Sequence, residues 1–404
     1  MITDPEALKS LMKEGSLLPQ EEMLAIANKK GSLTIGIPKE TTYQECRVAL
    51  NPEAVQLLTA NGHHIVVESG AGKFSRYEDV DYSEAGAEIA YDKEKVFKSN
   101  VILKVAPPSS EEIDIMPGNQ TLISALQLTL HPKEMLMTLM RKKITAIAWD
   151  YIQDEHSIYP VVRAMGEIAG NTSILIASEL LSDFKTGKGI MMGGVAGVQP
   201  TEVVILGAGT VGEYACRTAL GLGASVKVFD NSISKLRRLH NDIGSRVYTS
   251  VIQPKLLSKA IQRADVVIGA IRAPYGKTPC IVSDQMVQNM KPGSVIVDVS
   301  IDQGGCFATS KITNHEKPTY TKYDVIHYCV PNIASRVSRT ASIALSNIFS
   351  PIMLEMGDVG GCKGMILKDH GFRSGVYVYQ GQLTSQILGK VFDLPYKNIE
   401  WLLH

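Results

Sequence analysis

Hydrophobic positions alternate along the chain between short β-branched runs and longer stretches of helical spacing, beginning at residue 33. The short runs predict strands and the longer ones predict helices, because their apolar periods are those of extended and helical chain. Strands are predicted for LTIGIPKE, HIVVES, VILKV, TLISAL and ITAIAWD, and helices for NPEAVQLLTANG and HPKEMLMTLMRKK. Such alternation predicts a parallel sheet covered by helices.

A second alternating series follows a long helical segment, MGEIAGNTSILIASELL, and a glycine-rich stretch, GIMMGGVAGVQP. It contains six predicted strands, the number in a complete dinucleotide-binding sheet: EVVILG, SVKVFD, RVYT, DVVIGA, SVIVDVS and DVIHYCV. After Asn332, the segment SRVSRTASIALSNIFSPIMLEM predicts one long helix.

These series predict an α/β protein with two doubly wound domains. The simplest architecture inserts a Rossmann domain, residues 161–339, into a discontinuous outer substrate and oligomerisation domain, residues 34–160 and 340–404. Residues 1–33 predict an N-terminal extension, either one or two short amphipathic helices or a partly ordered tail. The extension has no signal-peptide pattern, and no apolar run is long enough to span a bilayer.

The charge balance limits the classes of partner. Lys plus Arg equals Asp plus Glu, at 41 each, so no basic excess favours binding to nucleic acid or to an anionic membrane. The six cysteines are scattered, without the spacing of a zinc site, which favours a reduced, cytoplasmic setting and no metal. Small molecules are therefore the expected partners.

The stretch VVILGAGTVG places Gly207, Gly209 and Gly212 between a predicted strand and a predicted helix. Gly207 would allow a tight turn, Gly209 would let the backbone approach a pyrophosphate, and Gly212 would permit close helix–strand packing. Asp230 ends the next strand and would bind the ribose hydroxyls, so NAD is favoured over NADP. Lys235 follows, either as a phosphate contact or as part of a solvated helix face.

The stretch VIVDVSIDQGGCF ends a predicted strand with Asp302, Gln303, Gly304 and Gly305, at the carboxyl edge where open α/β sheets bind ligands. Here the sequence resembles the alanine dehydrogenase family, which is related to the soluble NAD-binding subunit of proton-translocating transhydrogenase. The motifs that carry the resemblance are IGIPKE, ECRVAL, ESGAG, ILKV, GEIAG, MGGV, GAGTVG, KPGSVIVDVSIDQGGCF and YCVPNIAS. IDQGGCF is the most specific, because the transhydrogenase branch differs there.

The resemblance implies a substrate cleft between two domains and a homo-oligomer, a hexamer, built through the outer domain. It implies that Arg47 holds the substrate carboxylate, a task that suits the bidentate guanidinium fork. It also implies that Asp302 and Asn332 lie near the nicotinamide, with Gly304 and Gly305 giving Asp302 room.

The sequence departs from the family at two catalytic positions. The family's catalytic lysine is the second lysine of a K-V-K-E-P stretch, where this chain has Ala106 in LKVAPP. The family's histidine acid/base aligns with Gln127, which cannot shuttle a proton. Lys104 is a candidate substitute, because residues 104 and 106 would share one face of a strand. His131 and His156 are further candidates for the proton role.

The resemblance therefore predicts an NAD-dependent amino-acid dehydrogenase that interconverts L-alanine with pyruvate and ammonia. Arg47, Asp302 and Lys104, or a water held by Gln127, would carry the chemistry. Two alternatives stay open: a dehydrogenase for another 2-oxo acid or an imine, and a non-catalytic NAD(H)-binding module like the transhydrogenase subunit.

Overall fold

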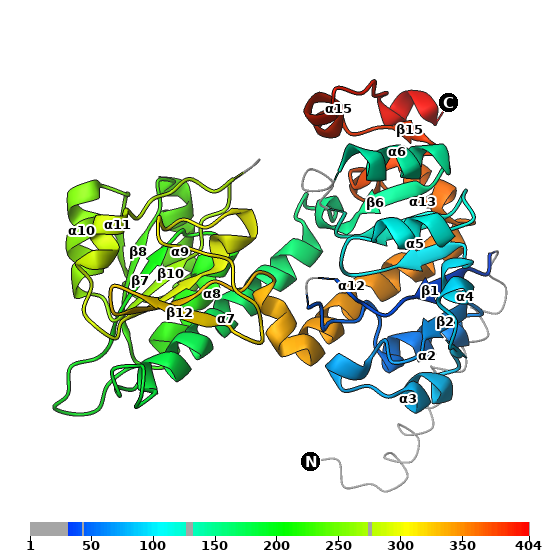
Figure 1. Cartoon of the computed structure of the whole chain (residues 1–404). Helices are drawn as coiled ribbons and strands as arrows, with labels where there is room; N and C mark the ends of the chain where they lie inside the picture. The colour runs from blue at the N-terminus through cyan, green and yellow to red at the C-terminus, as the bar shows by residue number, and fades with distance from the viewer. Residues whose placement is uncertain (1–30, 43, 127–131, 274–276, 404) are drawn as a thin grey trace, which may run out of the picture. The chain divides into compact units, whose positions relative to one another are not determined.

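A computed structural model describes residues 31–42, 44–126, 132–273 and 277–403 (Figure 1). The chain divides into two compact units, one formed by Met1–Val161 with Ser338–His404 and the other by Val162–Val337. Each unit has a largely parallel sheet with helices against it, so the predicted two-domain α/β class is confirmed. In the described part of the chain, no helix is long and apolar enough to cross a membrane.

The first unit contains an eight-stranded sheet in the order β15-β14-β6-β5-β4-β1-β2-β3. The first six strands of the chain are parallel, whereas β14 runs antiparallel to β6, and β15 antiparallel to β14. Their bounds are β1 Thr34–Ile37, β2 His64–Glu68, β3 Glu88–Ala90, β4 Val101–Leu103, β5 Thr121–Ser124, β6 Thr145–Ala148, β14 Val376–Tyr379 and β15 Gln382–Leu383. The C-terminal segment thus supplies one edge of this sheet.

The helices of the first unit are mostly short, and α12 is the long exception (orange in Figure 1). They are α2 Pro52–Ala60, α3 Asp79–Glu84, α4 Lys93–Phe97, α5 Ser110–Ile115, α6 Lys133–Arg141, α12 Ser338–Asp358, α13 Cys362–Lys368, α14 His370–Arg373 and α15 Gln386–Phe392, with 3-10 turns η1 Lys73–Ser75, η3 Trp149–Tyr151 and η6 Ile399–Leu402. Strand residues such as Ile102 and Leu122 pack with Leu136 of α6 and Leu388 of α15 in one buried cluster. Burial of these apolar side chains holds the helices on the sheet.

The second unit contains a seven-stranded sheet in the order β12-β13-β11-β10-β7-β8-β9. All six strands predicted from the sequence are present and parallel: β7 Glu202–Leu206, β8 Ser225–Phe229, β9 Tyr248–Ser250, β10 Val266–Gly269, β11 Val295–Asp298 and β13 Val325–Tyr328. This is the order of a dinucleotide-binding sheet. The sequence prediction missed β12, Thr319–Lys322, which pairs antiparallel with β13 at the edge.

Alternate residues of β7 face opposite layers of helices in the second unit. Val203 and Ile205 pack with residues of α7 Pro160–Ser182, α8 Thr210–Gly221 and α9 Ile233–Ile243. Val204 and Leu206 pack instead with α10 Pro254–Arg263 and α11 Asp284–Gln288. Both faces of the sheet are therefore covered, which leaves the strand ends as the place where loops and ligands gather.

His327 of β13 is fully buried between hydrogen-bond partners. Its Nδ1 lies 2.9 Å from the carbonyl oxygen of Val325, which can only accept, so Nδ1 carries the proton. Nε2, 2.8 Å from Oγ1 of Thr309, then accepts from that hydroxyl. The ring also stacks on Tyr320. Burial lowers the pKa of His327 to about 4, because the site disfavours the imidazolium.

Acid is therefore expected to destabilise the second unit through His327. The folded pKa lies below the unfolded one, so the contribution is complete above about pH 6.5 and is lost as pH falls toward 4. The loss amounts to about 3 kcal/mol at most. Urea unfolding at a series of pH values should show this slope in the wild type and in His156→Gln, whose exposed ring serves as the control. His327→Gln should flatten it; an unchanged slope would contradict the assignment.

Candidate active site

The glycine fingerprint turns the chain from β7 into α8. Gly207 has φ +109°, and a Cβ there would lie 2.4 Å from the carbonyl oxygen of Ala270. At Gly212 a Cβ would lie 1.9 Å from the carbonyl oxygen of Gly207, so α8 can approach the strand only with glycine there. A Cβ at Gly209 would meet nothing within 4 Å. Gly209 is also the N-cap of α8 and makes no side-chain cap bond, which leaves the helix N-terminus approachable by an anion.

Asp230 follows β8 and lies against this glycine loop. Its Oδ2 accepts a hydrogen bond from the backbone N–H of Ala208 at 2.7 Å, and its Oδ1 accepts one from Ser232 at 2.7 Å. Each carboxylate oxygen can accept a further bond. Lys235 donates its backbone N–H to Ser232 Oγ in the first turn of α9, whereas Nη2 of Arg238 donates to the carbonyl of Ala208. Arg238, which the sequence did not single out, is thus a cation whose side chain contacts the glycine loop.

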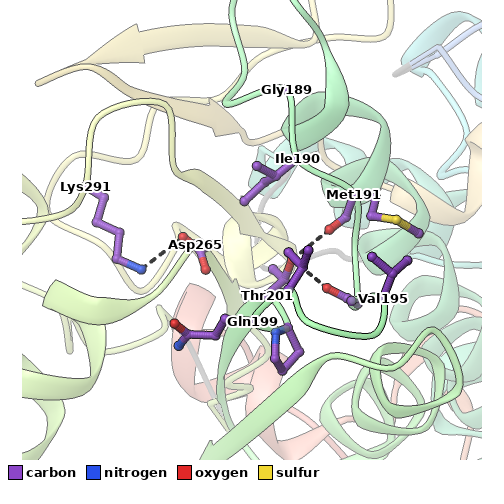
Figure 2. A pocket seen from close by; sticks show the side chains of 12 residues that line it. Gly189, Ile190, Met191, Val195, Gln199, Thr201, Asp265 and Lys291 are labelled. Carbon is purple, nitrogen blue, oxygen red and sulfur yellow. Dashed lines mark hydrogen bonds and ion pairs between the residues drawn. The ribbon is translucent and has the colours of Figure 1, made fainter.

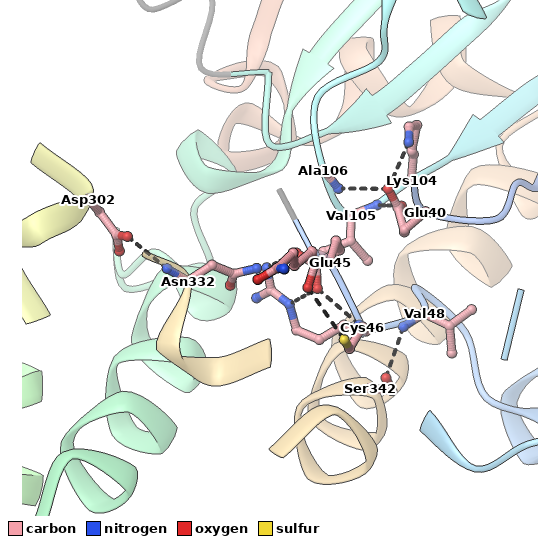
Figure 3. Close-up of polar contacts among 12 residues, drawn as sticks. Glu40, Glu45, Cys46, Val48, Lys104, Val105, Ala106, Asp302, Asn332 and Ser342 are labelled. Atoms are coloured by element: carbon pink, nitrogen blue, oxygen red, sulfur yellow. Dashed lines mark hydrogen bonds and ion pairs between the residues drawn. The ribbon is translucent and has the colours of Figure 1, made fainter. Parts of the chain in front are cut away.

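Asp302 lies in a 3-10 turn, η4 Val299–Gln303, which continues directly from β11 and ends at Gly304 in the left-handed region. Its Oδ1 accepts a hydrogen bond of 2.8 Å from the backbone N–H of Asn332 (Figure 3). Asn332 itself has φ +57°, a conformation that asparagine tolerates better than most residues. The structure therefore brings Asp302 and Asn332 together at the carboxyl edge of the sheet, where β11 and β13 end.

Gln303 ties the loop of Asp302 to the loop that follows β10. Its Oε1 accepts from the backbone N–H of Ala273 at 3.0 Å, and its Nε2 donates to the carbonyl of the same residue at 3.3 Å. The backbone oxygen of Gln303 also accepts from the N–H of Thr278 at 2.8 Å. The sequence identified Gln303 at this position but did not predict that Ala273 would bind its amide.

Gly304 and Gly305 were expected to give room to Asp302, and the structure shows a different role for Gly305. A Cβ at Gly305 would lie 2.5 Å from Oδ2 of Asp298, and one at Gly269 would lie 2.5 Å from its Oδ1. Gly305 therefore makes room for Asp298 and not for Asp302, whereas Gly304 supplies the left-handed end of η4.

Asp298 was not singled out by the sequence, yet it organises this loop. The side chain is buried and accepts hydrogen bonds from the backbone N–H groups of Ser300 and Cys306 and from Oγ of Ser310 at 2.6 Å. Burial raises the pKa of the Asp298 carboxyl, although these three donors favour its charged form. The sequence analysis did not single out Asp298, because it is the last residue of the apolar run VIVD and was assigned to the strand.

Arg47 lies in the loop between β1 and α2 and is held by Glu45. Nε of Arg47 donates to Oε1 of Glu45 at 2.7 Å and Nη2 donates to Oε2 at 2.6 Å, a two-bond ion pair (Figure 3). Both side chains are buried, with 8% and 2% of their surface exposed. Such pairing fixes the plane of the guanidinium. The family resemblance implies that Arg47 binds a carboxylate, and the ion pair with Glu45 was not predicted.

A stripe of serines on α12 positions the segment that follows Arg47. Ser342 Oγ accepts from the backbone N–H of Val48 at 2.9 Å, and Ser346 Oγ accepts from that of Asn51 at 2.8 Å. Oγ of Ser342 also lies 2.9 Å from Oγ of Ser75. The spacing of Ser338, 342, 346 and 350 by four residues in a long apolar helix was the available signal, because these positions share one face.

Lys104 is fully buried between two carboxylates. Its Nζ lies 2.7 Å from Oε2 of Glu40 (Figure 3). The same Nζ lies 3.5 Å from Oε2 of Glu112, which also pairs with Lys93. Burial alone would lower the pKa of Lys104, but the attraction of Glu40 and Glu112 outweighs it and raises the pKa above its ordinary value. Glu40 additionally accepts from the backbone N–H of Val105 at 2.6 Å.

Residues 104 and 106 also differ from the expected extended strand, because β4 ends at Leu103. Ala106 is buried and its N–H lies 3.4 Å from the Glu40 carboxylate that binds Lys104 (Figure 3). Gln127 and His131 lie outside the described residues. His156 is exposed, on a turn beside Glu155. Lys104 is therefore enclosed by acid partners in the structure, an environment that stabilises its charged form.

A cavity of about 410 Å³ lies at the opposite edge of the second sheet (Figure 2). It is lined by the glycine-rich loop from Gly189 to Thr201 and by Asp265 and Lys291, which pair at 3.0 Å. Thr201 and Asp265 directly precede β7 and β10, so this cavity is at the amino ends of the strands, away from the glycine fingerprint. Within the described residues, no group of three or more His, Cys, Asp or Glu is placed to hold a metal ion.

Comparison with known families covers both units. The model for the alanine dehydrogenase/PNT N-terminal domain matches residues 36–169, and that for the C-terminal domain matches residues 173–386. An alanine dehydrogenase from Mycolicibacterium smegmatis is 39% identical over 367 residues, which cover 91% of this chain and 98% of that protein. One from Methanococcus maripaludis is 38% identical over 374 residues, covering 92% and 100%.

Solved structures show the same relationship. An L-alanine dehydrogenase superposes with a TM-score of 0.84 at 36% identity, over 89% of this chain and 99% of that one. A transhydrogenase from Sinorhizobium meliloti superposes with a TM-score of 0.75 at 24% identity, over 88% and 99%. The second likeness shows the fold alone.

Proposed function

The chain belongs to the alanine dehydrogenase/PNT family, and from this premise we propose that it is an NAD-dependent alanine dehydrogenase. The reaction oxidises L-alanine with NAD⁺ and water to pyruvate, ammonium and NADH. The observation that carries the proposal is the 37–39% identity to alanine dehydrogenases over more than nine-tenths of the chain. The transhydrogenase-like module is less favoured, because that likeness is one of fold.

The residues at the carboxyl edge of the second sheet fit a dinucleotide. Open space beside Gly209 and the uncapped N-terminus of α8 suit a pyrophosphate, and Asp230 suits the ribose hydroxyls. When bound, the nicotinamide accepts or donates the hydride. Asp302 and Asn332, joined by a hydrogen bond, would orient the nicotinamide end, with the negative charge of Asp302 favouring the cationic iminium formed from alanine.

Arg47 would bind the substrate carboxylate, with its guanidinium held in place by two hydrogen bonds to the Glu45 carboxylate. Because the pair fixes the guanidinium plane, little side-chain entropy would be lost on binding the acid. Glu45 would thus act as a positioning residue for Arg47.

Lys104 would position its neighbours and would not transfer protons. The carboxylates of Glu40 and Glu112 stabilise the protonated form of Lys104 and raise its pKa. A lysine that acts as a base at neutral pH needs a lowered pKa instead. The ion pair instead fixes Glu40, which binds the backbone at Val105 and Ala106. Proton transfer would then fall to a water, for which Gln127 is the proposed hydrogen-bond partner.

The cofactor preference gives a test of Asp230. NAD should bind at least tenfold more tightly than NADP, about 1.4 kcal/mol, because a carboxylate repels the additional phosphate. Calorimetry with each nucleotide measures the ratio. Asp230→Ser should reduce it, whereas Asp242→Ser, at an exposed position of α9, should leave it unchanged. Equal affinities in the wild type would contradict the role of Asp230.

The activity itself is tested by mixing the protein with L-alanine and NAD⁺ at alkaline pH and recording NADH absorbance. Turnover of L-alanine is expected, and reductive amination of pyruvate should run in reverse with ammonium and NADH. Tight NADH binding without either reaction would favour the non-catalytic module.

The second candidate, a dehydrogenase for a larger 2-oxo acid or an imine, is favoured by the alanine at position 106. A small apolar side chain there replaces a cationic one and changes what the pocket can recognise. Ala106→Lys with Gln127→His should raise L-alanine turnover if the site is a weakened alanine site. If the site serves another substrate, the double variant should gain no alanine activity and should lose the native one.

The assembly and setting are also proposals. We propose a homo-oligomer, a hexamer, in a reduced cytoplasmic compartment, with residues 1–33 as an extension, residues 34–160 and 340–404 as the outer domain, and residues 161–339 as the nucleotide domain. Light scattering of the purified chain would give the number of subunits.

A further inference from the structure

Gln303 is the one side chain of η4 that binds the loop after β10 by both ends of an amide. Oε1 accepts from the N–H of Ala273 and Nε2 donates to the carbonyl of Ala273. The backbone carbonyl of Gln303 accepts from Thr278, on the far side of the same loop in sequence. Three hydrogen bonds therefore join one residue to this loop.

The arrangement imitates a pair of backbone hydrogen bonds between neighbouring strands. The side chain must accept from one atom and donate to another, which an amide does at any pH and a carboxyl group does only when protonated. The partners also fix which end of the amide is oxygen, since the Ala273 carbonyl cannot donate. Asp302 is the adjacent residue, so whatever holds Gln303 also limits the motion of the backbone that carries Asp302.

We propose that Gln303 is a positioning residue that fastens the loop after β10 to η4, so that Asp302 keeps one orientation at the nucleotide edge. The inference rests on the proposed function for its catalytic readout, but the fastening itself does not require that activity. Asp298 holds the other side of the loop through Cys306 and Ser310. The backbone around Asp302 is then held on two sides. Asp298 binds the segment that follows η4, and Gln303 binds the loop after β10.

The test uses Gln303→Glu, which has nearly the same shape. When protonated, the carboxyl group can donate to the Ala273 carbonyl and accept from its N–H, as the amide does; when ionised it cannot donate. The ordinary pKa of glutamate is about 4.3, and the Ala273 carbonyl can be bound only by the protonated form, so the pKa of the introduced carboxyl should be raised. The ratio of variant to wild-type kcat/KM for pyruvate should therefore be highest at pH 5.5, the acid end of the range. It should fall at least about tenfold by pH 8.5, the size expected from losing one hydrogen bond and gaining a repulsion.

Two controls separate positioning from charge and from general loss of structure. Gln288→Glu adds the same charge at an exposed position of the second unit and should leave the ratio constant with pH. Gln303→Met makes neither bond and should lower kcat at both pH values alike. Its primary isotope effect with deuterated NADH should rise, because a mispositioned site slows hydride transfer, whereas partial unfolding only lowers the number of active molecules.

The NADH affinity, measured by fluorescence, distinguishes this inference from the proposed function. In Gln303→Glu the dissociation constant should also rise with pH, because the loop after β10 lies at the nucleotide edge. If the wild type does not turn over alanine but the NADH dissociation constant of Gln303→Glu rises with pH, the proposed function is refuted. The role of Gln303 in holding the loop after β10 is then still supported. A constant kcat/KM ratio and a constant affinity ratio across this pH range would overturn the inference. If Gln303→Glu does not fold, a Gln303→Met enzyme with the wild-type isotope effect and kcat would overturn it.

Discussion

Arg47→Lys is expected to lower kcat/KM for pyruvate by about 10²-fold, nearly as much as Arg47→Ala. A lysine ammonium is a point charge and cannot bind Glu45 through two parallel bonds while also presenting donors to a substrate carboxylate. Losing one charge-assisted hydrogen bond costs about 1.5–3 kcal/mol, which corresponds to this fall. Steady-state kinetics with pyruvate as the varied substrate measures it.

The affinity for NADH should change little in both Arg47 variants, since the glycine fingerprint belongs to the other unit. Arg163→Lys is a suitable control, because Arg163 also pairs with a glutamate but is about half exposed on α7. Glu45→Gln should give a smaller loss than Arg47→Lys, because its amide still accepts one bond from the guanidinium. Full activity in Arg47→Lys would exclude Arg47 as the carboxylate ligand.

The sequence predicted the features whose residues are close together along the chain. Gly207, Gly209 and Gly212 fall within six positions, and their roles follow from a turn between one strand and one helix. Four of the six parallel strands of the second unit, β7, β10, β11 and β13, were readable because they are buried, mostly β-branched runs. β8 was readable from its alternating pattern, whereas β9, Tyr248–Ser250, is predicted although none of its residues is buried. The edge strand β12 was missed, because Thr319–Lys322 is polar and only partly buried.

Features that depend on distant partners could not be read from the chain. Lys104 and Glu40 are 64 positions apart, and only the adjacency of β1 and β4 in the sheet brings them together. The same holds for Gln303, whose amide meets a loop 30 positions earlier. Lys104 was a candidate substitute for the missing lysine because it would share a strand face with residue 106, and the sequence shows the charge of a residue and not the carboxylates around it.

The environment of Lys104 makes its replacement a second large effect, on stability. Lys104→Met keeps the length of the side chain but leaves Glu40 and Glu112 buried beside an apolar group. Removing one partner of a buried ion pair costs about 3–5 kcal/mol, because the remaining charge loses its compensation. Thermal unfolding should show a lower Tm for the transition of the first unit, whereas Lys95→Met, which removes an exposed partner of Glu88, should change it little.

The pH dependence and a double variant then separate a structural role from a catalytic one. Because the folded pKa of Lys104 is raised, its contribution to stability is complete below about pH 10.5 and is lost only as pH rises through the folded value. Lys104→Met should therefore be destabilised relative to the wild type throughout the neutral range. Adding Glu40→Gln should recover part of the loss, since it removes one uncompensated charge, and a double-mutant cycle measures the coupling. A Lys104→Met protein with wild-type stability and no turnover would instead show that Lys104 takes part in the chemistry.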